Sequence, residues 1–397
     1  MKWSRRYDGT DKLSDVPTEL VVDDQNGKVY VTGSINYQIG GSRDVATIQY
    51  SKNGSELWID QYDGPASADD YPASIALDIK GNVFVVGSSK GEMTSYDLVT
   101  MKYLGKEYDQ WPSRFNNGSG NNWTNAMTID QNGNVYVIGT DSSHYLIVKY
   151  DSIGVKQWSE EFGQSGSNPT GIAVDGSGNV YVTGYSAGLN NNLDYATLKY
   201  DASGNQKWVA WYNGTADDVD RASAITLDSS GSVYVTGTSA GAGTRNDYLT
   251  IKYDSSGAQK WTARYNGSSN LDESAVSLAL DKIGNVYVTG TGIRNGSSND
   301  FLTIKYNSKG AKVWDIYYDG TGNGTDVAKA IAVDDIGSVY ITGRSFGSLT
   351  LSDYVTIKYN TYGIQEWIAR YDGPENNNDD PVALAIDTNT NVFVTGS

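Results

Sequence analysis

The sequence predicts an all-β protein in which residues 1–397 form a single β-propeller domain. A five-residue phrase, Val-Tyr-Val-Thr-Gly or a near copy, occurs eight times. Its closing glycines lie 54, 52, 45, 53, 53, 53 and 53 residues apart, a period typical of solenoids, propellers and arrays. No segment long enough for a helix shows a 3.6-residue apolar period. These observations favour a propeller of four-stranded antiparallel blades.

Each repeat contains four short segments with strand patterns. In the repeat at residues 223–265, tight turns at Gly231 and Gly257 and two longer loops separate these segments. The segments are rich in β-branched and aromatic residues, which fit a pleated and half-buried surface. Four antiparallel strands joined in this order form one propeller blade, and the expected strands are 224–228, 233–237, 248–253 and 260–265.

Most of the tryptophans follow the repeat. A Tyr is followed eight residues later by a Trp seven times, and Trp3 is an eighth copy without its Tyr. Such Trp could stack on a carbohydrate, but strict periodicity favours packing between blades. Trp123 and Trp211 lie outside the pattern, so they are the Trp candidates for ligand binding. The paired positions are Tyr50/Trp58, Tyr103/Trp111, Tyr150/Trp158, Tyr200/Trp208, Tyr253/Trp261, Tyr306/Trp314 and Tyr359/Trp367.

Two phrases carry a resemblance to a known family. Gly-Asn-Val-Tyr-Val-Thr-Gly and Asp-Tyr-X-Thr-Ile-Lys-Tyr-Asp-Ser-Ser-Gly-X-X-X-Trp resemble the SBBP-type β-propeller repeats of bacterial and archaeal surface proteins. Residues 254–261 are also similar to the tryptophan-docking motif of eight-bladed quinoprotein propellers, in blade construction only. The resemblance implies an extracellular or cell-surface location and no established catalysis, and it supplies no active-site residues.

The strand count predicts eight blades. Seven complete blades run from about residue 19 to residue 371. The expected outer strand at 3–7 and the inner pair at 382–386 and 392–396 would form an eighth blade from both termini, without its Tyr-type third strand. Such joining leaves fewer exposed sheet edges. The alternative is a chain cut from a longer array, and eight inner strands with eight outer Trp favour the closed ring.

Composition limits the partners. A net charge of −17 argues against nucleic acid, because phosphate binding needs clustered Lys and Arg. The absence of cysteine excludes disulfides and thiolate metal sites. No apolar run approaches the ~20 residues that span a bilayer, so we expect no membrane-spanning segment. The first residues lack the apolar core of a signal peptide, which suggests a mature or excised domain.

Two recurring Asp positions have structural explanations. One closes every inner strand before a turn, where an Asp accepts hydrogen bonds from backbone N–H groups in an Asx turn. The other precedes the third strand, and in one repeat it holds His144, the single histidine of the chain. His144 is a candidate ligand-binding residue, although replacement of a structural Asp is the favoured explanation.

A third set of acids lies in the loops that enter the inner strands. We expect these residues to surround one mouth of the central channel, where carboxylates and carbonyls suit Ca2+. The cation ligands proposed from sequence are Asp217, Asp218 and Asp326, although no calcium-loop motif is present. The alternative, hydrogen bonding within each loop, explains the repetition without a ligand. The candidate ligand-binding acids are Asp70, Asp220, Glu273, Asp326 and Asp379.

The motifs argue against an enzyme. No Gly-X-Ser-X-Gly, Cys nucleophile, His pair or P-loop occurs, and Glu19 is the sole carboxylate expected within an inner strand. The sequence predicts a non-catalytic extracellular module that binds protein or glycan through its loop-rich face, without a cofactor other than Ca2+. The alternative is a carbohydrate-active enzyme, a glycosidase or lyase, that uses carboxylates at the channel mouth.

Overall fold

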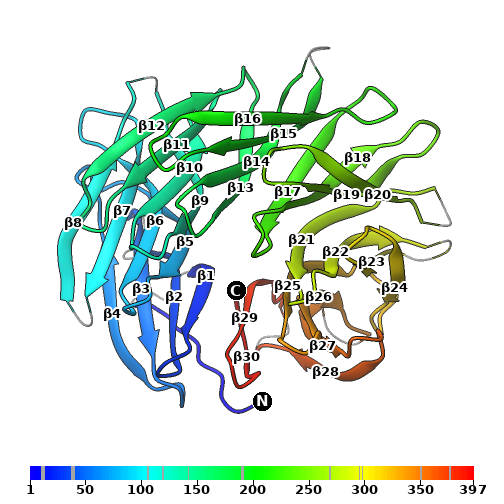
Figure 1. Cartoon of the computed structure of the whole chain (residues 1–397). Coiled ribbons are helices and arrows are strands. Elements are labelled where there is room, and N and C mark those ends of the chain that lie inside the picture. The colour runs from blue at the N-terminus through cyan, green and yellow to red at the C-terminus, as the bar shows by residue number, and fades with distance from the viewer. Residues whose placement is uncertain are drawn as a thin grey trace.

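The fold of the chain is an all-β propeller, as the sequence predicts. The structure is a computed structural model that describes residues 1–9, 14–36, 41–104, 107–118, 120–141, 143–188, 192–267, 270–294, 296, 298–348, 351–374 and 377–397. Within these ranges there are seven four-stranded sheets and one two-stranded sheet, all antiparallel. Figure 1 shows them arranged around a central axis, with both termini at one seam of the ring.

The first strand of each blade lies nearest the axis, where it contacts the first strands of the neighbouring blades. A β-bulge interrupts these strands, for example between Ala222 and Ala224. We number the blades I to VIII in chain order. Their inner strands are β1 (Val16–Asp23), β5 (Asp70–Leu77), β9 (Trp123–Ile129), β13 (Asn168–Val174), β17 (Asp220–Leu227), β21 (Ser274–Leu280), β25 (Val327–Val333) and β29 (Pro381–Ile386).

The second strand of each blade contains the repeated phrase and is almost wholly buried in blades II to VII. Its alternating residues pack on both neighbouring blades, which explains a composition rich in β-branched and aromatic residues. These strands are β2 (Lys28–Asn36), β6 (Val83–Lys90), β10 (Val135–Thr140), β14 (Val180–Ala187), β18 (Val233–Ala240), β22 (Val286–Ile293), β26 (Val339–Phe346) and β30 (Val392–Gly396).

The third and fourth strands complete blades I to VII. The third strands are β3 (Arg43–Tyr50), β7 (Tyr96–Leu104), β11 (Tyr145–Tyr150), β15 (Leu193–Tyr200), β19 (Asn246–Tyr253), β23 (Asn299–Tyr306) and β27 (Ser352–Tyr359). The outer strands are β4 (Glu56–Tyr62), β8 (Glu107–Phe115), β12 (Lys156–Phe162), β16 (Gln206–Tyr212), β20 (Gln259–Tyr265), β24 (Lys312–Tyr318) and β28 (Gln365–Tyr371).

The core is a series of apolar layers between adjacent blades. In one layer, Val233, Val235 and Leu249 of blade V pack with Tyr181 and Tyr195 of blade IV. Each blade therefore buries one face on the preceding blade and the other on the following blade. This arrangement explains how a chain with 38% hydrophobic residues closes a large ring.

The periodic Trp residues pack between blades, as predicted. A Cβ added at Gly257 would lie 2.7 Å from the Trp208 ring of the preceding blade, so this glycine provides a seat for the indole. It also adopts a φ of +86°, which favours glycine. Five indole Nε1 groups donate 3.1–3.2 Å hydrogen bonds to turn carbonyls of the next blade. The Trp111 side chain lies outside the described residues.

Blade VIII joins the two ends of the chain. Strands β29 and β30 pair only with each other, while β1 contacts both of them. Trp3 lies 6.2 Å from Phe393 of β30 and 6.2 Å from Tyr50 of blade I, between ring centroids. The expected outer strand at 3–7 is not formed as a strand, because no third strand lies beside it to share a backbone ladder.

Antiparallel connectivity gives the ring two different faces. Turns between first and second strands, and between third and fourth strands, lie on one face; the longer loops lie on the other, which we call the loop face. The Asx turns predicted at the inner-strand Asp residues are confirmed: Asp228 Oδ1 accepts 2.9 Å bonds from the N–H groups of Ser230 and Ser232. No helix in the described residues is long and apolar enough to cross a membrane.

Candidate functional site

The acids predicted at the channel mouth lie on the loop face but are buried in their own loops. Asp70, Asp220, Glu273 and Asp326 are 0% exposed, and Asp379 is partly buried. In the four aspartates, a carboxylate oxygen accepts a 2.5–2.7 Å hydrogen bond from the backbone N–H of the glycine six residues earlier. The four aspartates therefore hold the interblade loops, which is the alternative that sequence repetition favoured.

The three acids predicted as cation ligands do not form one group. Asp217 accepts a 2.7 Å bond from Asn213 Nδ2, and Asp218 caps the N–H of Val219, both in the loop between blades IV and V. Asp326 lies between blades VI and VII, where its neighbouring carboxylates are Asp300 and Asp319. Residues at equivalent positions of the repeat lie on different blades. Acids that look alike in the sequence are therefore far apart in the ring.

Three aromatic side chains form a partly exposed group on the loop face of blades II and III. Trp123 stacks on Tyr96 with ring centroids 4.5 Å apart and an interplanar angle of 25°, and Tyr71 lies 5.8 Å from both rings. Trp123 is 37% exposed. We call Tyr71, Tyr96 and Trp123 the aromatic group. The sequence identified Trp123, but its two tyrosines come from other strands and could not be assigned to it.

Hydrogen bonds hold the aromatic group in place. The Tyr71 hydroxyl donates to Asp69 Oδ2 at 3.0 Å, and burial together with this carboxylate raises the pKa of Tyr71 to about 12. Tyr71 therefore stays a neutral phenol at physiological pH. The Thr124 N–H donates a 2.8 Å bond to Ser88 Oγ, which ties the start of β9 to blade II. The group is preorganised, so a ligand would not have to order it.

Trp211, the other Trp outside the pattern, is 45% exposed on blade IV. Its ring centroid lies 5.8 Å from that of Phe162 on blade III. This pair is a second aromatic contact between neighbouring blades, with Trp211 partly open to solvent.

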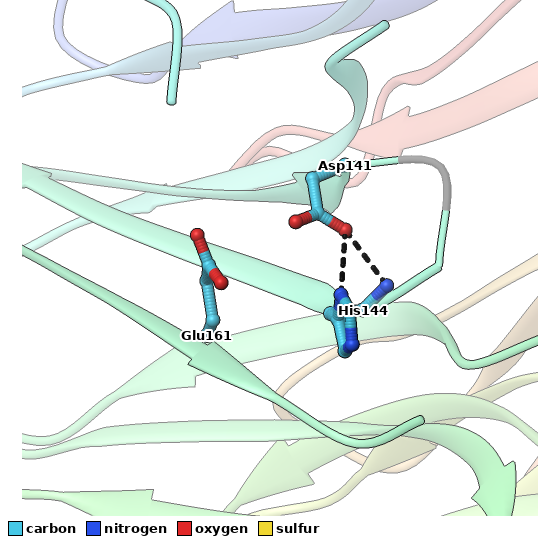
Figure 2. A group of neighbouring side chains, drawn as sticks. All are labelled: Asp141, His144 and Glu161. Atoms are coloured by element: carbon cyan, nitrogen blue, oxygen red, sulfur yellow. Dashed lines mark hydrogen bonds and ion pairs between the residues drawn. The ribbon is translucent and has the colours of Figure 1, made fainter. Parts of the chain in front are cut away.

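His144 lies directly before β11, on the loop face of blade III. Figure 2 shows its ring beside Asp141, with Glu161 of β12 on the other side of the Asp141 carboxylate. His144 Nδ1 is 3.1 Å from Asp141 Oδ1, which also accepts a 2.8 Å bond from the His144 N–H. Burial raises the pKa of Asp141, but hydrogen bonds from His144, Ser143 and Asn117 lower it by more, so the net shift of the pKa is downward.

Arg–Asp pairs at the same place in other blades were not found from the sequence. In each pair the Asp begins the third strand and the Arg, 17 residues later, lies on the outer strand. Each Arg also donates a hydrogen bond to a serine hydroxyl of the second strand. The repeat itself could have revealed them, because Asp and Arg recur at a fixed interval. The pairs are Asp97–Arg114, Asp247–Arg264 and Asp353–Arg370, with N–O distances of 3.0, 2.8 and 2.7 Å.

The central channel has little chemical functionality. Its cavity of about 350 Å3 is lined mainly by small polar and aliphatic residues of the inner strands. Glu19 is a carboxylate at this wall, and burial raises its pKa despite bonds from the Ile75 N–H and the Ser74 hydroxyl. The Glu19 carboxyl is therefore engaged by the neighbouring inner strand.

Together the blades and their interblade Trp contacts define a β-propeller repeat protein. Residues 61–92 and 157–192 match the SBBP β-propeller repeat. The chain is thus a β-propeller that carries SBBP-type repeats, in agreement with the resemblance of its sequence phrases.

The chain also has a longer sequence relative. The chain is 23% identical over 435 aligned positions to an uncharacterized WD repeat-containing protein, L264, of Acanthamoeba polyphaga mimivirus. The alignment covers 96% of this chain but only 28% of that protein, so the chain spans about a quarter of its length.

Solved structures that are similar to this chain have low sequence identity to it. A protein from Lactobacillus plantarum superposes with a TM-score of 0.51 and 12% identity, over 86% of this chain and 95% of that one. Virginiamycin B lyase from Staphylococcus aureus gives a TM-score of 0.48 and 14% identity, over 82% and 91%. The similarity to the Lactobacillus plantarum protein concerns the fold alone.

Proposed function

We propose that the chain is a non-catalytic, extracellular binding module that holds a glycan or protein partner on its loop face. The aromatic group carries this proposal, because three rings from different strands expose a preorganised surface beside polar loop atoms. Variable loops on a rigid scaffold are common binding positions. A glycan suits the site best, since flat rings can contact the apolar face of a sugar while Asp69 and nearby loop groups bond its hydroxyls.

The alternative of a glycosidase or lyase receives less support from the site. Such an enzyme needs carboxylates that reach the substrate. The predicted mouth acids are instead buried and accept hydrogen bonds from their own loops. Calcium at Asp217, Asp218 and Asp326 is likewise unsupported as a single site, because Asp326 lies on a different interblade loop from Asp217 and Asp218.

Binding of soluble polysaccharides and a glycan array would test the proposal. We expect Trp123→Ala to weaken binding about tenfold or more, because truncating an aromatic residue that anchors a ligand typically costs about 2 kcal/mol or more. Tyr362→Ala is the matched control, since this 78% exposed aromatic lies on the face with the tight turns.

Equal binding by wild type and Trp123→Ala would reject the aromatic group as the site. Product formation from any polysaccharide, followed in the same samples, would reject the non-catalytic role. A ligand retained by wild type and Tyr362→Ala but lost from Trp123→Ala would support both parts of the proposal.

A further inference from the structure

Blade III differs from its neighbours at one charged position. In blades II, V and VII, a buried Asp at the start of the third strand pairs with an Arg of the outer strand. The equivalent positions of blade III hold His144 and Glu161. A guanidinium is thus replaced by a carboxylate, and a second carboxylate, Asp141, lies three residues before the histidine.

The three side chains converge on a small space. One ligand atom from each of Asp141, His144 and Glu161 lies within 4.8 Å of the other two. Asn117 Nδ2 donates to Asp141 Oδ2 at 3.0 Å and to Glu161 Oε1 at 2.9 Å, so a single donor atom bridges both carboxylates. That bridging position is where a positive charge between the carboxylates would be most stabilised.

The site combines a fixed ligand with two adjustable ones. The Asp141 side chain is only 3% exposed and is held by N–H groups of its own turn. His144 is 41% exposed and Glu161 is exposed, so both are accessible from solvent and have room to rotate. An ion can therefore enter without opening the blade.

We propose that Asp141, His144 and Glu161 bind a divalent transition-metal ion, for which Zn2+ is the representative. An imidazole nitrogen with two carboxylate oxygens is a donor set that suits Zn2+. Ligand atoms bound tetrahedrally to one zinc are about 3.4 Å apart, because the bonds are about 2.1 Å long. Rotation of Glu161 and His144 closes the remaining gap, and the Asn117 amide, turned over, offers Oδ1 as a further oxygen donor.

The imidazole distinguishes this site from the oxygen-only groups on other blades. Asp44, Asp63 and Asp70 form such a group between blades I and II, and hard oxygen ligands alone suit Ca2+ or Mg2+. Among the metal-ligand groups of the described residues, only the blade III site therefore explains binding of Zn2+ in preference to Ca2+. The proposal is independent of glycan or protein binding at the aromatic group.

The single histidine makes the test direct. Zn2+ is titrated into the full chain without a histidine tag. Binding is followed in the 1H–15N NMR spectrum of the one imidazole, with calorimetry in parallel. We expect Zn2+ to shift the imidazole resonances at micromolar concentrations, while Ca2+ at the same concentration leaves them unchanged. Unshifted resonances at millimolar Zn2+ would overturn the proposal.

Two variants and a control locate the ligands. Glu161→Gln and His144→Gln should each weaken the tightest Zn2+ binding about tenfold or more, since each removes one of the three ligands. Glu160→Gln removes the same charge from the adjacent residue of β12 and should bind as wild type. Equal affinity of Glu161→Gln and Glu160→Gln would show that Zn2+ binds elsewhere, and thermal melts would verify that every variant is folded.

Discussion

The glycine that ends each repeated phrase is required by close contact between strands. A Cβ added at Gly237 would lie 2.1 Å from the carbonyl oxygen of Arg221, on the inner strand of the same blade. The bulge in that inner strand brings its backbone against the second strand at this point. The same close approach occurs at Gly139, Gly184 and Gly343, which explains why the phrase closes on glycine in every repeat.

Gly237→Ala should therefore lower the stability of the protein. We expect a loss of about 1–3 kcal/mol, typical of overpacking, because backbone atoms rather than a flexible side chain oppose the new methyl. Thermal melts would measure it. Gly176→Ala is the matched control, since its nearest neighbour would be Gln131 Nε2 at 3.9 Å. Similar melting temperatures for the two variants would contradict this explanation.

At the scale of elements, ring closure depends on a short N-terminal segment that is not a strand. Trp3 Nε1 donates a 3.1 Å bond to the Lys52 carbonyl, and Arg5 Nε donates a 2.7 Å bond to the Gly54 carbonyl. Trp3 thus makes on blade I the contact that Trp208 makes on blade V. Trp367 is 36% exposed, because the blade that follows it has no third strand on which to pack.

We expect Trp3→Ala to reduce the melting temperature more than Trp367→Ala does. The two residues occupy the same repeat position, but only Trp3 packs against a complete neighbouring blade. Loss of the indole should cost about 2 kcal/mol, less than the ~3–5 kcal/mol of a fully buried aromatic. The larger loss in Trp367→Ala, or no loss in Trp3→Ala, would mean that the N-terminal segment does not close the ring.

For the whole molecule, charge sets the dependence of stability on pH. The net charge is −17, and burial raises the pKa of Asp44 and Asp194 to about 6 and that of Glu273 to about 7, with nearby carboxylates adding to each shift. The folded state therefore binds more protons than the unfolded state between about pH 4 and pH 7. Stability from these groups is present at low pH and decreases as the pH rises through this window.

The melting temperature should therefore increase when the pH is lowered from 7.5 to 5. Below about pH 4 it should decrease again, because carboxylates with lowered pKa values, such as Asp228 at about 2, lose their hydrogen bonds on protonation. Glu273→Gln should stabilise the protein at pH 7.5 and have little effect at pH 5. Asp272→Asn, whose side chain is 45% exposed, is the control. A melting temperature that falls steadily from pH 7.5 to 5 would contradict the raised pKa values of these buried carboxyl groups.

Some features of the candidate sites followed from sequence, and others could not. Trp123 and His144 were identified because each interrupts a strict repeat. Their neighbours Tyr96 and Glu161 were missed, because both occupy ordinary strand positions. Glu161 approaches His144 only when β11 and β12 pair, and Tyr96 approaches Trp123 only when blades II and III pack together. The mouth acids were located on the correct loops, but sequence alone could not decide whether their carboxylates face solvent or their own backbone.

The sequence by itself determined the β-propeller, its four-stranded blades, the packing role of the periodic Trp and the Asx turns, because each depends on local spacing repeated along the chain. Only the tertiary structure decided the burial of the mouth acids, the composition of the aromatic group and the convergence of Asp141, His144 and Glu161. These features depend on how neighbouring blades and strands meet, and a repeat period specifies the average contact between blades but not the exceptions at individual positions.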